Sequence, residues 1–268
     1  MKNYYPNFFQ SVIHTNPSQL WRAVLDLFFP RHCLDCGAEK TWLCPDCLDY
    51  LPRSYAPIED KIFSVFDYSS PVVKQVIWRL KYKRSLELAE TLAKPMHDLL
   101  LEELEDELIV TGPRATGLKS NFEDPRSWTS SPSPQIILIP APLSPARFRS
   151  RGYNQAKVLA QQIARLNPTQ FIVRADLVKK VKNTPTQVSI KSREQRLANL
   201  KGAFEITASC ESEKSFFVQL NATSHLAHQI FVIIDDVSTT GATINEIRQL
   251  LAHHFGARHL YGLVVAHG

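Results

Sequence analysis

Short apolar runs alternate with amphipathic segments along most of this 268-residue chain. Apolar runs bounded by turn residues predict strands, and apolar residues recurring every three or four positions predict helices. The expected strands are 61–68, 135–140, 177–182, 230–234 and 259–265, and the expected helices are 71–81, 85–108, 154–166, 192–200 and 243–255. Strands that alternate with helices indicate an α/β fold, a parallel sheet with helices on both faces.

Two segments interrupt this alternation and predict loop inserts. Residues 111–135 are rich in Pro, Ser and Gly without periodicity, and residues 206–229 are mostly polar. Residues 1–55, with a short amphipathic helix at 20–29, form a separate N-terminal module, and residues 56–268 form the main domain. No apolar stretch is long enough to span a bilayer, so we expect a soluble protein without stable membrane insertion.

Four cysteines in the N-terminal module are spaced as Cys33-x2-Cys36-x7-Cys44-x2-Cys47. Two Cys-x-x-Cys pairs supply four thiolates for a closed tetrahedral Zn²⁺ site, which would be structural because no coordination position is left open. The alternative is a pair of disulfides. No signal peptide precedes the cysteines, which predicts a reducing, cytoplasmic location, and Cys210 would be left unpaired under oxidation. The spacing therefore favours zinc.

The richest chemical signal is the segment 231–243, where an apolar run ends in two adjacent acids and a Thr/Gly turn leads into a helix. At a junction between strand and helix, free backbone N–H groups and the positive helix end favour a phosphate. The acids can accept hydrogen bonds from a ribose diol or help to hold Mg²⁺. The candidate ligands are Asp235, Asp236, Ser238, Thr239, Thr240, Gly241, Ala242 and Thr243. The alternative is a buried strand whose polar turn only caps a helix.

Positive charge is concentrated in one part of the chain. Residues 147–201 contain thirteen Lys and Arg and two acids, a net charge of +11, although the whole chain carries only +5. Such an excess indicates a polyanionic ligand, either phosphate, pyrophosphate or nucleic acid, and the alternative is a solvated basic face. Arg147, Arg149 and Arg151 follow a proline-stiffened loop and offer planar donors to phosphate oxygens. Phe148 and Tyr153 are available to stack on bases.

Segment 232–243 resembles the phosphoribosyl pyrophosphate (PRPP) loop of type I phosphoribosyltransferases. The order of motifs along the chain closely resembles the ComF competence-protein family, in which ComFC-like members combine a zinc finger with a phosphoribosyltransferase-like domain. The motifs are the four cysteines, Lys81-Tyr-Lys-Arg, Arg151-Gly-Tyr-Asn-Gln, Thr184-Pro-Thr-Gln with Arg196-x-x-Asn-Leu-Lys-Gly-Ala-Phe, and the PRPP loop. The resemblance runs from about residue 27 to 265. The two inserts and the ending 264–268 depart from the family.

The resemblance implies that the two acids hold the ribose hydroxyls of Mg²⁺-bound PRPP and that the turn cradles its 5′-phosphate. Arg147, Arg149, Arg151 and Lys81 would then face pyrophosphate or DNA phosphates. The family is associated with uptake and handling of single-stranded DNA in natural transformation, with a helicase-type protein as a possible partner. A binding protein in DNA uptake and an active phosphoribosyltransferase on an unidentified acceptor both stay open. A zinc-ribbon interaction protein with a vestigial sheet fits less well.

Overall fold

A computed structural model describes residues 30–54, 58–111, 135–182, 200–207 and 229–268. The chain divides into two compact units, Met1–Asp49 and Tyr50–Gly268. The helix expected at 20–29, nearly all of the helix at 192–200, the 184–187 motif and most of both inserts lie outside the described residues.

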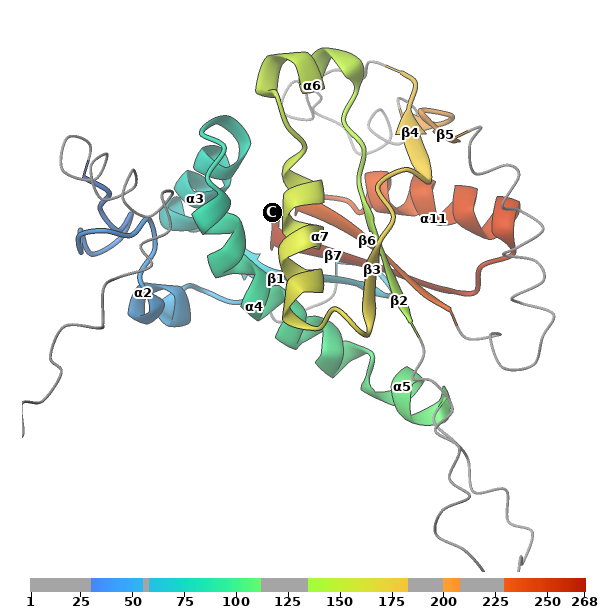
Figure 1. The fold of residues 1–268 in the computed structure, drawn as a ribbon, viewed down its shortest axis with the longest axis horizontal. Helices are drawn as coiled ribbons and strands as arrows, with labels where there is room; N and C mark the ends of the chain where they lie inside the picture. The colour runs from blue at the N-terminus through green and yellow to red at the C-terminus, as the bar shows by residue number, and fades with distance from the viewer. Residues whose placement is uncertain (1–29, 55–57, 112–134, 183–199, 208–228) are drawn as a thin grey trace, which may run out of the picture. The chain divides into compact units, whose positions relative to one another are not determined.

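The larger unit is built on a five-stranded sheet in the order β1-β7-β6-β2-β3 (Figure 1). Every neighbouring pair is parallel. The strands are β1 (Ile62–Asp67), β2 (Ile136–Pro140), β3 (Phe171–Val173), β6 (Ile230–Ser238) and β7 (His259–His267). All residues of β2 are buried, as expected for a strand covered on both faces. The structure confirms the α/β fold with a parallel sheet.

Helices cover both faces of this sheet. The helices described in the larger unit are α3 (Pro71–Tyr82), α4 (Leu86–Glu103), α5 (Glu105–Thr111), α6 (Pro145–Arg151), α7 (Gln155–Leu166) and α11 (Ala242–Phe255). Helices α4 and α7 pack together on one face, and α11 packs on the other beside a small antiparallel sheet of β4 (Val178–Lys180) and β5 (Phe204–Ile206).

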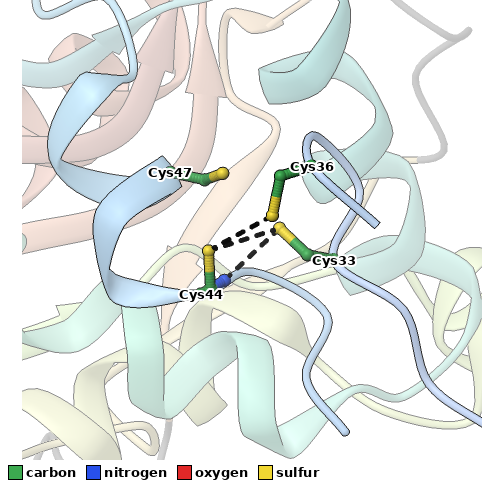
Figure 2. A group of neighbouring side chains, drawn as sticks. All are labelled: Cys33, Cys36, Cys44 and Cys47. Carbon is green, nitrogen blue, oxygen red and sulfur yellow. Dashed lines mark hydrogen bonds between the residues drawn. The ribbon is translucent and has the colours of Figure 1, made fainter. Parts of the chain in front are cut away.

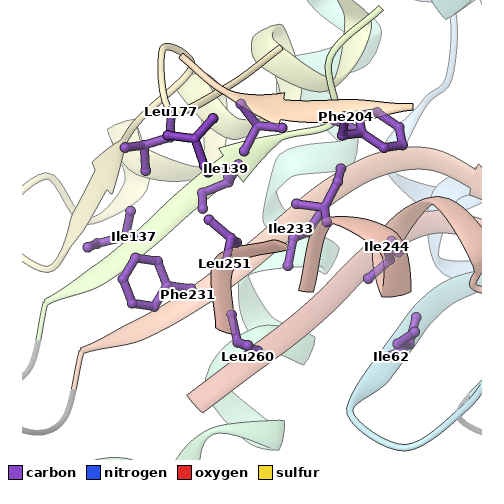
Figure 3. Packing of buried hydrophobic residues seen from close by; sticks show 14 of the residues in the cluster. Ile62, Ile137, Ile139, Leu177, Phe204, Phe231, Ile233, Ile244, Leu251 and Leu260 are labelled. Carbon is purple, nitrogen blue, oxygen red and sulfur yellow. The ribbon is translucent and has the colours of Figure 1, made fainter. Parts of the chain in front are cut away.

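The core on the α11 side explains why the small sheet belongs to this domain. Ile137 and Ile139 of β2 face Leu177 and Phe204 from the small sheet and its approach (Figure 3). Leu251 of α11 lies over the centre of the same cluster. These side chains are at most 5% exposed, so the small sheet is held by apolar burial rather than by backbone pairing with the main sheet.

One helix prediction was wrong in detail and one helix was missed, both for local reasons. The single helix expected at 85–108 is interrupted at Leu104, the C-cap of α4. Helix α5 then begins with three acids in its first turn, where they are favourable to the helix dipole, whereas they would be unfavourable at the end of a continuous helix. The proline-stiffened loop contains helix α6, because Pro145 occupies its first turn and Ser144 caps it.

The strand predictions differ from the structure in pairing, in two short strands and in one strand end. The strand expected at 177–182 exists as β4, but it pairs antiparallel with β5 outside the main sheet. Strands β3 and β5 were not predicted, because three residues are too few for a periodic signal. The strand expected at 230–234 continues to Ser238, so both acids are strand residues.

Candidate functional site

The two acids lie where β6 extends beyond its neighbour β2. Pro140, the last residue of β2, pairs with Ile234, and β6 continues for four residues along β7. Successive strand residues point to opposite faces of a sheet, so Asp235 and Asp236 project on opposite sides of this edge. The carboxyl end of a parallel sheet is where ligands of open α/β folds bind.

Asp236 is almost completely buried, at 4% exposure, and both of its oxygens are engaged. Its Oδ1 lies 3.2 Å from Lys81 Nζ at the end of α3, and its Oδ2 accepts a hydrogen bond of 2.8 Å from Gln155 Nε2 at the start of α7. A buried carboxylate without such partners would be costly, so these two contacts stabilise its charge. Lys81, predicted to face phosphate, therefore forms an ion pair with Asp236.

Asp235 occupies a different electrostatic environment. Its Oδ1 accepts a hydrogen bond of 2.8 Å from the Asp236 backbone N–H. Burial, followed by the negative charge of Asp236, raises the pKa of Asp235 to about 7, against the opposing effects of Lys81 and Lys180. A buried carboxylate next to a half-buried one with a raised pKa is suited to bind a cation or a hydrogen-bond donor.

Lys180 of β4 is a site residue that sequence reasoning did not single out. Burial, and then the positive charge of Arg147, lowers the pKa of Lys180 to about 8, while Asp235 acts in the opposite direction. Cations from α3 and β4 therefore act on the acids, and Arg147 of α6 acts on Lys180. The signal in the sequence was the basic segment 147–201, but which of its cations reaches the acids depends on the separate small sheet.

The turn after β6 is stabilised by a hydrogen bond between its own residues. Ser238, only 8% exposed, accepts a hydrogen bond of 3.0 Å at its Oγ from the Gly241 N–H. Gly241 has φ +68° and occupies the N-cap position of α11 without a side-chain cap. Ala242 is buried, and Thr239, Thr240 and Thr243 are half-buried. An uncapped helix start beside threonine hydroxyls is the arrangement that the phosphate prediction requires.

The end of the chain supports this turn, a role that sequence reasoning did not foresee. His267 Nε2 donates to the Thr239 carbonyl at 3.2 Å, and the Gly268 N–H donates to the Ser238 carbonyl at 3.2 Å. His267 is the last residue of β7 and pairs in register with Ser238. The last two residues of the sequence thus contact the start of the turn.

Substitution of Gly241 by Ala tests how tightly this turn is packed. Its Cβ would lie 3.0 Å from both Glu59 Oε2 and Ile62 Cδ1, in a left-handed backbone. Gly256 at the other end of α11 is the matched control, since its φ is +66° and nothing lies within 4 Å of the added Cβ. We expect about 1–2 kcal/mol of destabilisation for Gly256→Ala and about 1–3 kcal/mol more for Gly241→Ala. Denaturant unfolding measures both, and equal losses would contradict the crowding at Gly241.

The Arg-Gly-Tyr-Asn-Gln motif is a connection between two helices with a defined role for each residue. Gly152 ends α6 with φ +72°. Asn154 caps α7 by accepting from the Ala156 N–H at 3.0 Å, and its Nδ2 donates to the Ala141 carbonyl at 3.0 Å. This connection places Gln155 against Asp236. Gln155 lay within a predicted motif but was not recognised as a site residue.

The aromatic and basic residues of this region are only partly arranged as expected. Arg149 is exposed, and Arg147 and Arg151 are half-buried. Phe148 is 51% exposed and so accessible to a base. Tyr153 is 9% exposed, so the expectation that it stacks on bases is wrong. A tyrosine between two helices packs inward there, with the Arg84 guanidinium 5.7 Å from its ring.

The four cysteines of the smaller unit converge on one point (Figure 2). Cys33 and Cys36 lie on a turn that Gly37 closes with φ +78°, and Cys44 and Cys47 lie at the start of α2 (Pro45–Tyr50). All four Sγ atoms lie within 4.8 Å of one another. None is in a disulfide.

The sulfur spacing fits a metal better than a covalent bridge. Cys44 Sγ lies 3.7 Å from Cys33 Sγ and 3.6 Å from Cys36 Sγ. A tetrahedron with Zn–S bonds of about 2.3 Å has edges of about 3.8 Å, whereas a disulfide bond is about 2.05 Å. Burial acts to raise the pKa of the Cys33 thiol, but backbone N–H groups of Cys44, Asp35 and Cys36 outweigh it and bring that pKa to about 6. The cluster can hold a zinc ion as predicted.

The described part of the chain also contains a pocket away from the acids. A pocket of about 330 Å³ lies between α7 and β3, lined by residues that include Gln161, Arg165 and Phe171. Phe171 is paired with Ile136 at the amino ends of the strands, so this pocket is at the opposite edge of the sheet from the acids. None of the helices in the described ranges has the length and apolar character needed to cross a membrane.

Known proteins resemble this chain over most of its length. Competence protein F of Haemophilus influenzae is 30% identical over 223 residues, which cover 83% of this chain and 79% of that protein. DNA utilization protein YhgH of Escherichia coli is 30% identical over 225 residues, 84% of this chain and 79% of that protein. Competence protein ComFC of Streptococcus pneumoniae is 31% identical over 117 residues, 44% of this chain and 41% of that protein. No protein-family model matches the sequence. Identity at this level over more than four fifths of the chain shows that it belongs to the ComF family.

Proposed function

We propose that this protein binds PRPP, or a related ribose phosphate, together with Mg²⁺, and that it acts in the uptake and handling of single-stranded DNA during natural transformation. The ribose-phosphate part is supported by the adjacent carboxylates of Asp235 and Asp236, by the charges of Lys81 and Lys180 near them, and by the uncapped helix start that follows. Carboxylates for a diol beside N–H groups for a phosphate match the two ends of a ribose phosphate.

Each part of the site has a distinct role in this proposal. Asp235 and Asp236 accept hydrogen bonds from the ribose hydroxyls, and Ser238, Thr240 and Gly241 belong to the turn that receives the 5′-phosphate. Mg²⁺ would be held through this carboxylate pair and would neutralise phosphate charge. Lys81 and Gln155 contact Asp236 in the free protein. When the ligand binds, part of these contacts is replaced by contacts with the ligand.

The DNA role is supported by the relatives and by charge. Proteins named for competence and for DNA utilization match this chain over 79–84% of their own length. The segment 147–201 carries a net charge of +11, and α6 presents three arginines from that segment. Guanidinium groups release counterions from a phosphate backbone, which favours binding of a nucleic acid without sequence preference.

Parallel titrations of the zinc-replete full chain test both parts. Mg²⁺–PRPP is titrated by calorimetry, and a labelled oligothymidylate is titrated by fluorescence anisotropy at several salt concentrations. The proposal expects both to bind. Binding of Mg²⁺–PRPP without binding of the oligonucleotide would overturn the DNA role and favour a phosphoribosyltransferase with another acceptor. Absence of PRPP binding would overturn the ribose-phosphate site.

The arginines of α6 provide the sharper DNA test. The variant Arg149→Ala/Arg151→Ala removes up to two phosphate contacts, so the slope of log affinity against log salt should become less steep by about one to two. Lys94→Ala/Arg258→Ala is a control of equal charge, because Lys94 and Arg258 are exposed basic residues outside segment 147–201. An unchanged slope in the arginine variant would exclude α6 from the phosphate interface.

A further inference from the structure

One exposed face of α3 presents two aromatic rings outside the ribose-phosphate site. Trp78 is 52% exposed and Tyr82 is 54% exposed. They are four residues apart on the helix and therefore adjacent on its surface. Their ring centroids are 5.7 Å apart with an interplanar angle of 47°. Two large rings are thus available side by side on a helix whose opposite face is buried.

Cations accompany both rings. Lys83 Nζ lies 5.5 Å from the centre of the Trp78 ring, and Arg151 Cζ, from α6, lies 5.4 Å from the centre of the Tyr82 ring. We call this surface the α3 platform; it consists of Trp78, Tyr82, Lys83 and Arg151. From residue 71 to residue 86 the chain has five Lys or Arg and no acid. The platform is therefore aromatic and strongly positive.

The occurrence of two exposed rings together with neighbouring cations is more than ordinary surface exposure explains. Single exposed apolar residues are normal on a protein surface. Among the described residues, however, four aromatic side chains are strongly exposed, and three of these lie on α3 and α6: Trp78, Tyr82 and Phe148. An aromatic pair spaced by four residues adds only a little to helix stability, which is a weak reason to expose two large rings.

We propose that the α3 platform binds unpaired bases of single-stranded DNA by stacking, with its cations on the flanking phosphates. This inference rests on the proposed DNA role and names the surface that would serve it. Aromatic faces interleaved with basic side chains bind single strands without sequence preference, because every base offers a π-face to stack. Paired bases in a duplex do not offer these faces, so the platform distinguishes single strands from double strands.

The platform borders the ribose-phosphate site. Lys81, the residue before Tyr82, forms the ion pair with Asp236, and Arg151 precedes the connection that positions Gln155 on the same carboxylate. Neither Trp78 nor Tyr82 is among the groups that engage Asp235 or Asp236. A stacked strand and a bound ribose phosphate would therefore occupy neighbouring but separate surfaces.

The test compares Trp78→Ala/Tyr82→Ala with Trp78→Phe/Tyr82→Phe in the full chain. We expect the alanine variant to bind oligothymidylate about tenfold to a hundredfold more weakly at every salt concentration, with an unchanged salt slope. The phenylalanine variant should bind within about threefold of the wild type, because it retains rings that can stack. Leu166→Ala, which truncates another exposed apolar side chain on α7, should leave the affinity unchanged.

Two further readouts separate the platform from the wider function. Mg²⁺–PRPP binding and thermal unfolding of the alanine variant should match the wild type, since both rings are exposed. Unchanged oligothymidylate binding in that variant would overturn the platform and leave a DNA role to other surfaces. An equal loss of duplex binding would overturn stacking as the mode of contact. Failure of the wild type to bind single strands would overturn both the platform and the DNA role.

Discussion

The variant Asp235→Asn/Asp236→Asn should lose binding of Mg²⁺–PRPP, with an affinity at least about a hundredfold below that of the wild type. Each carboxylate supplies charge-assisted hydrogen bonds worth about 1.5–3 kcal/mol, so removal of both charges costs about 3–6 kcal/mol. Asparagine keeps the volume and an acceptor oxygen, so the sheet edge should keep its shape. Calorimetric titration in the presence of Mg²⁺ measures the loss.

The control for this variant is its stability. Asp235 has a raised pKa, so its charged form is disfavoured in the folded state, and Asp235→Asn alone should not lower the free energy of unfolding at neutral pH. Asp236→Asn alone should be the more destabilising of the two, because it leaves Lys81 without its ion pair. PRPP affinity equal to that of the wild type in a folded double variant would show that the acids do not hold the ribose.

The same titration should depend on pH in a direction fixed by Asp235. A carboxyl whose pKa rises from 3.8 when unfolded to about 7 when folded binds more protons in the folded state between those values. Its contribution to stability is therefore present at low pH and is lost as pH rises towards 7. A Mg²⁺-bound ligand requires the ionised form, so affinity should rise towards pH 7 and level off above it. Calorimetry below pH 7 in buffers of different ionisation enthalpy should detect protons released on binding.

Removal of Cys36, a candidate zinc ligand, should unfold the cysteine unit. Four thiolates form a closed site, and a structural zinc contributes about 10–16 kcal/mol of apparent binding energy, much of which is folding energy. In Cys36→Ser we expect metal content near zero in elemental analysis and loss of hydrogen-exchange protection in residues 30–49. Cys36 is the most exposed of the four cysteines, so the effect of its loss comes from coordination and not from a packing defect.

Cys210→Ser is the matched control, because it removes a thiol outside the four-cysteine spacing. It should retain one zinc ion per chain and the protection of residues 30–49. A chelator should reproduce the Cys36→Ser result in the wild type and in the control alike. A wild type that contains no zinc and still shows hydrogen-exchange protection in residues 30–49 would refute the proposed zinc site. The backbone N–H groups around Cys33 would then stabilise the thiols without a metal.

The local parts of this protein could be predicted because their signals are local. An apolar run, a polar cap and a helical period lie within a few residues of one another, as at Ser70 before α3 and Asn154 before α7. The same holds for the two Cys-x-x-Cys pairs, whose spacing already limits the geometry of the turn. Short elements such as β3 and β5 escaped because their existence depends on a partner strand that is distant in the sequence.

The aromatic residues show that the exposure of a side chain could not be predicted from the sequence. Sequence reasoning chose Tyr153 for base stacking, and Tyr153 is buried, whereas Trp78 and Tyr82 are exposed and were not singled out. The type of residue says that a ring is present, but burial depends on which elements pack against it. The burial of a ring is set by contacts between segments that are distant in the sequence, so no local sequence pattern predicts it.

By itself, the sequence determined the α/β class, the four-cysteine cluster, the acids near the end of β6 and the glycine of the turn that follows, since each depends on neighbours in the chain. Only the tertiary structure decided what surrounds the acids. It brought Lys81 and Gln155 to Asp236, Lys180 to the neighbourhood of Asp235, and His267 to the turn. Charge and hydrogen bonding act through space, so the environment of a site follows from how the strands and helices pack and not from their order alone.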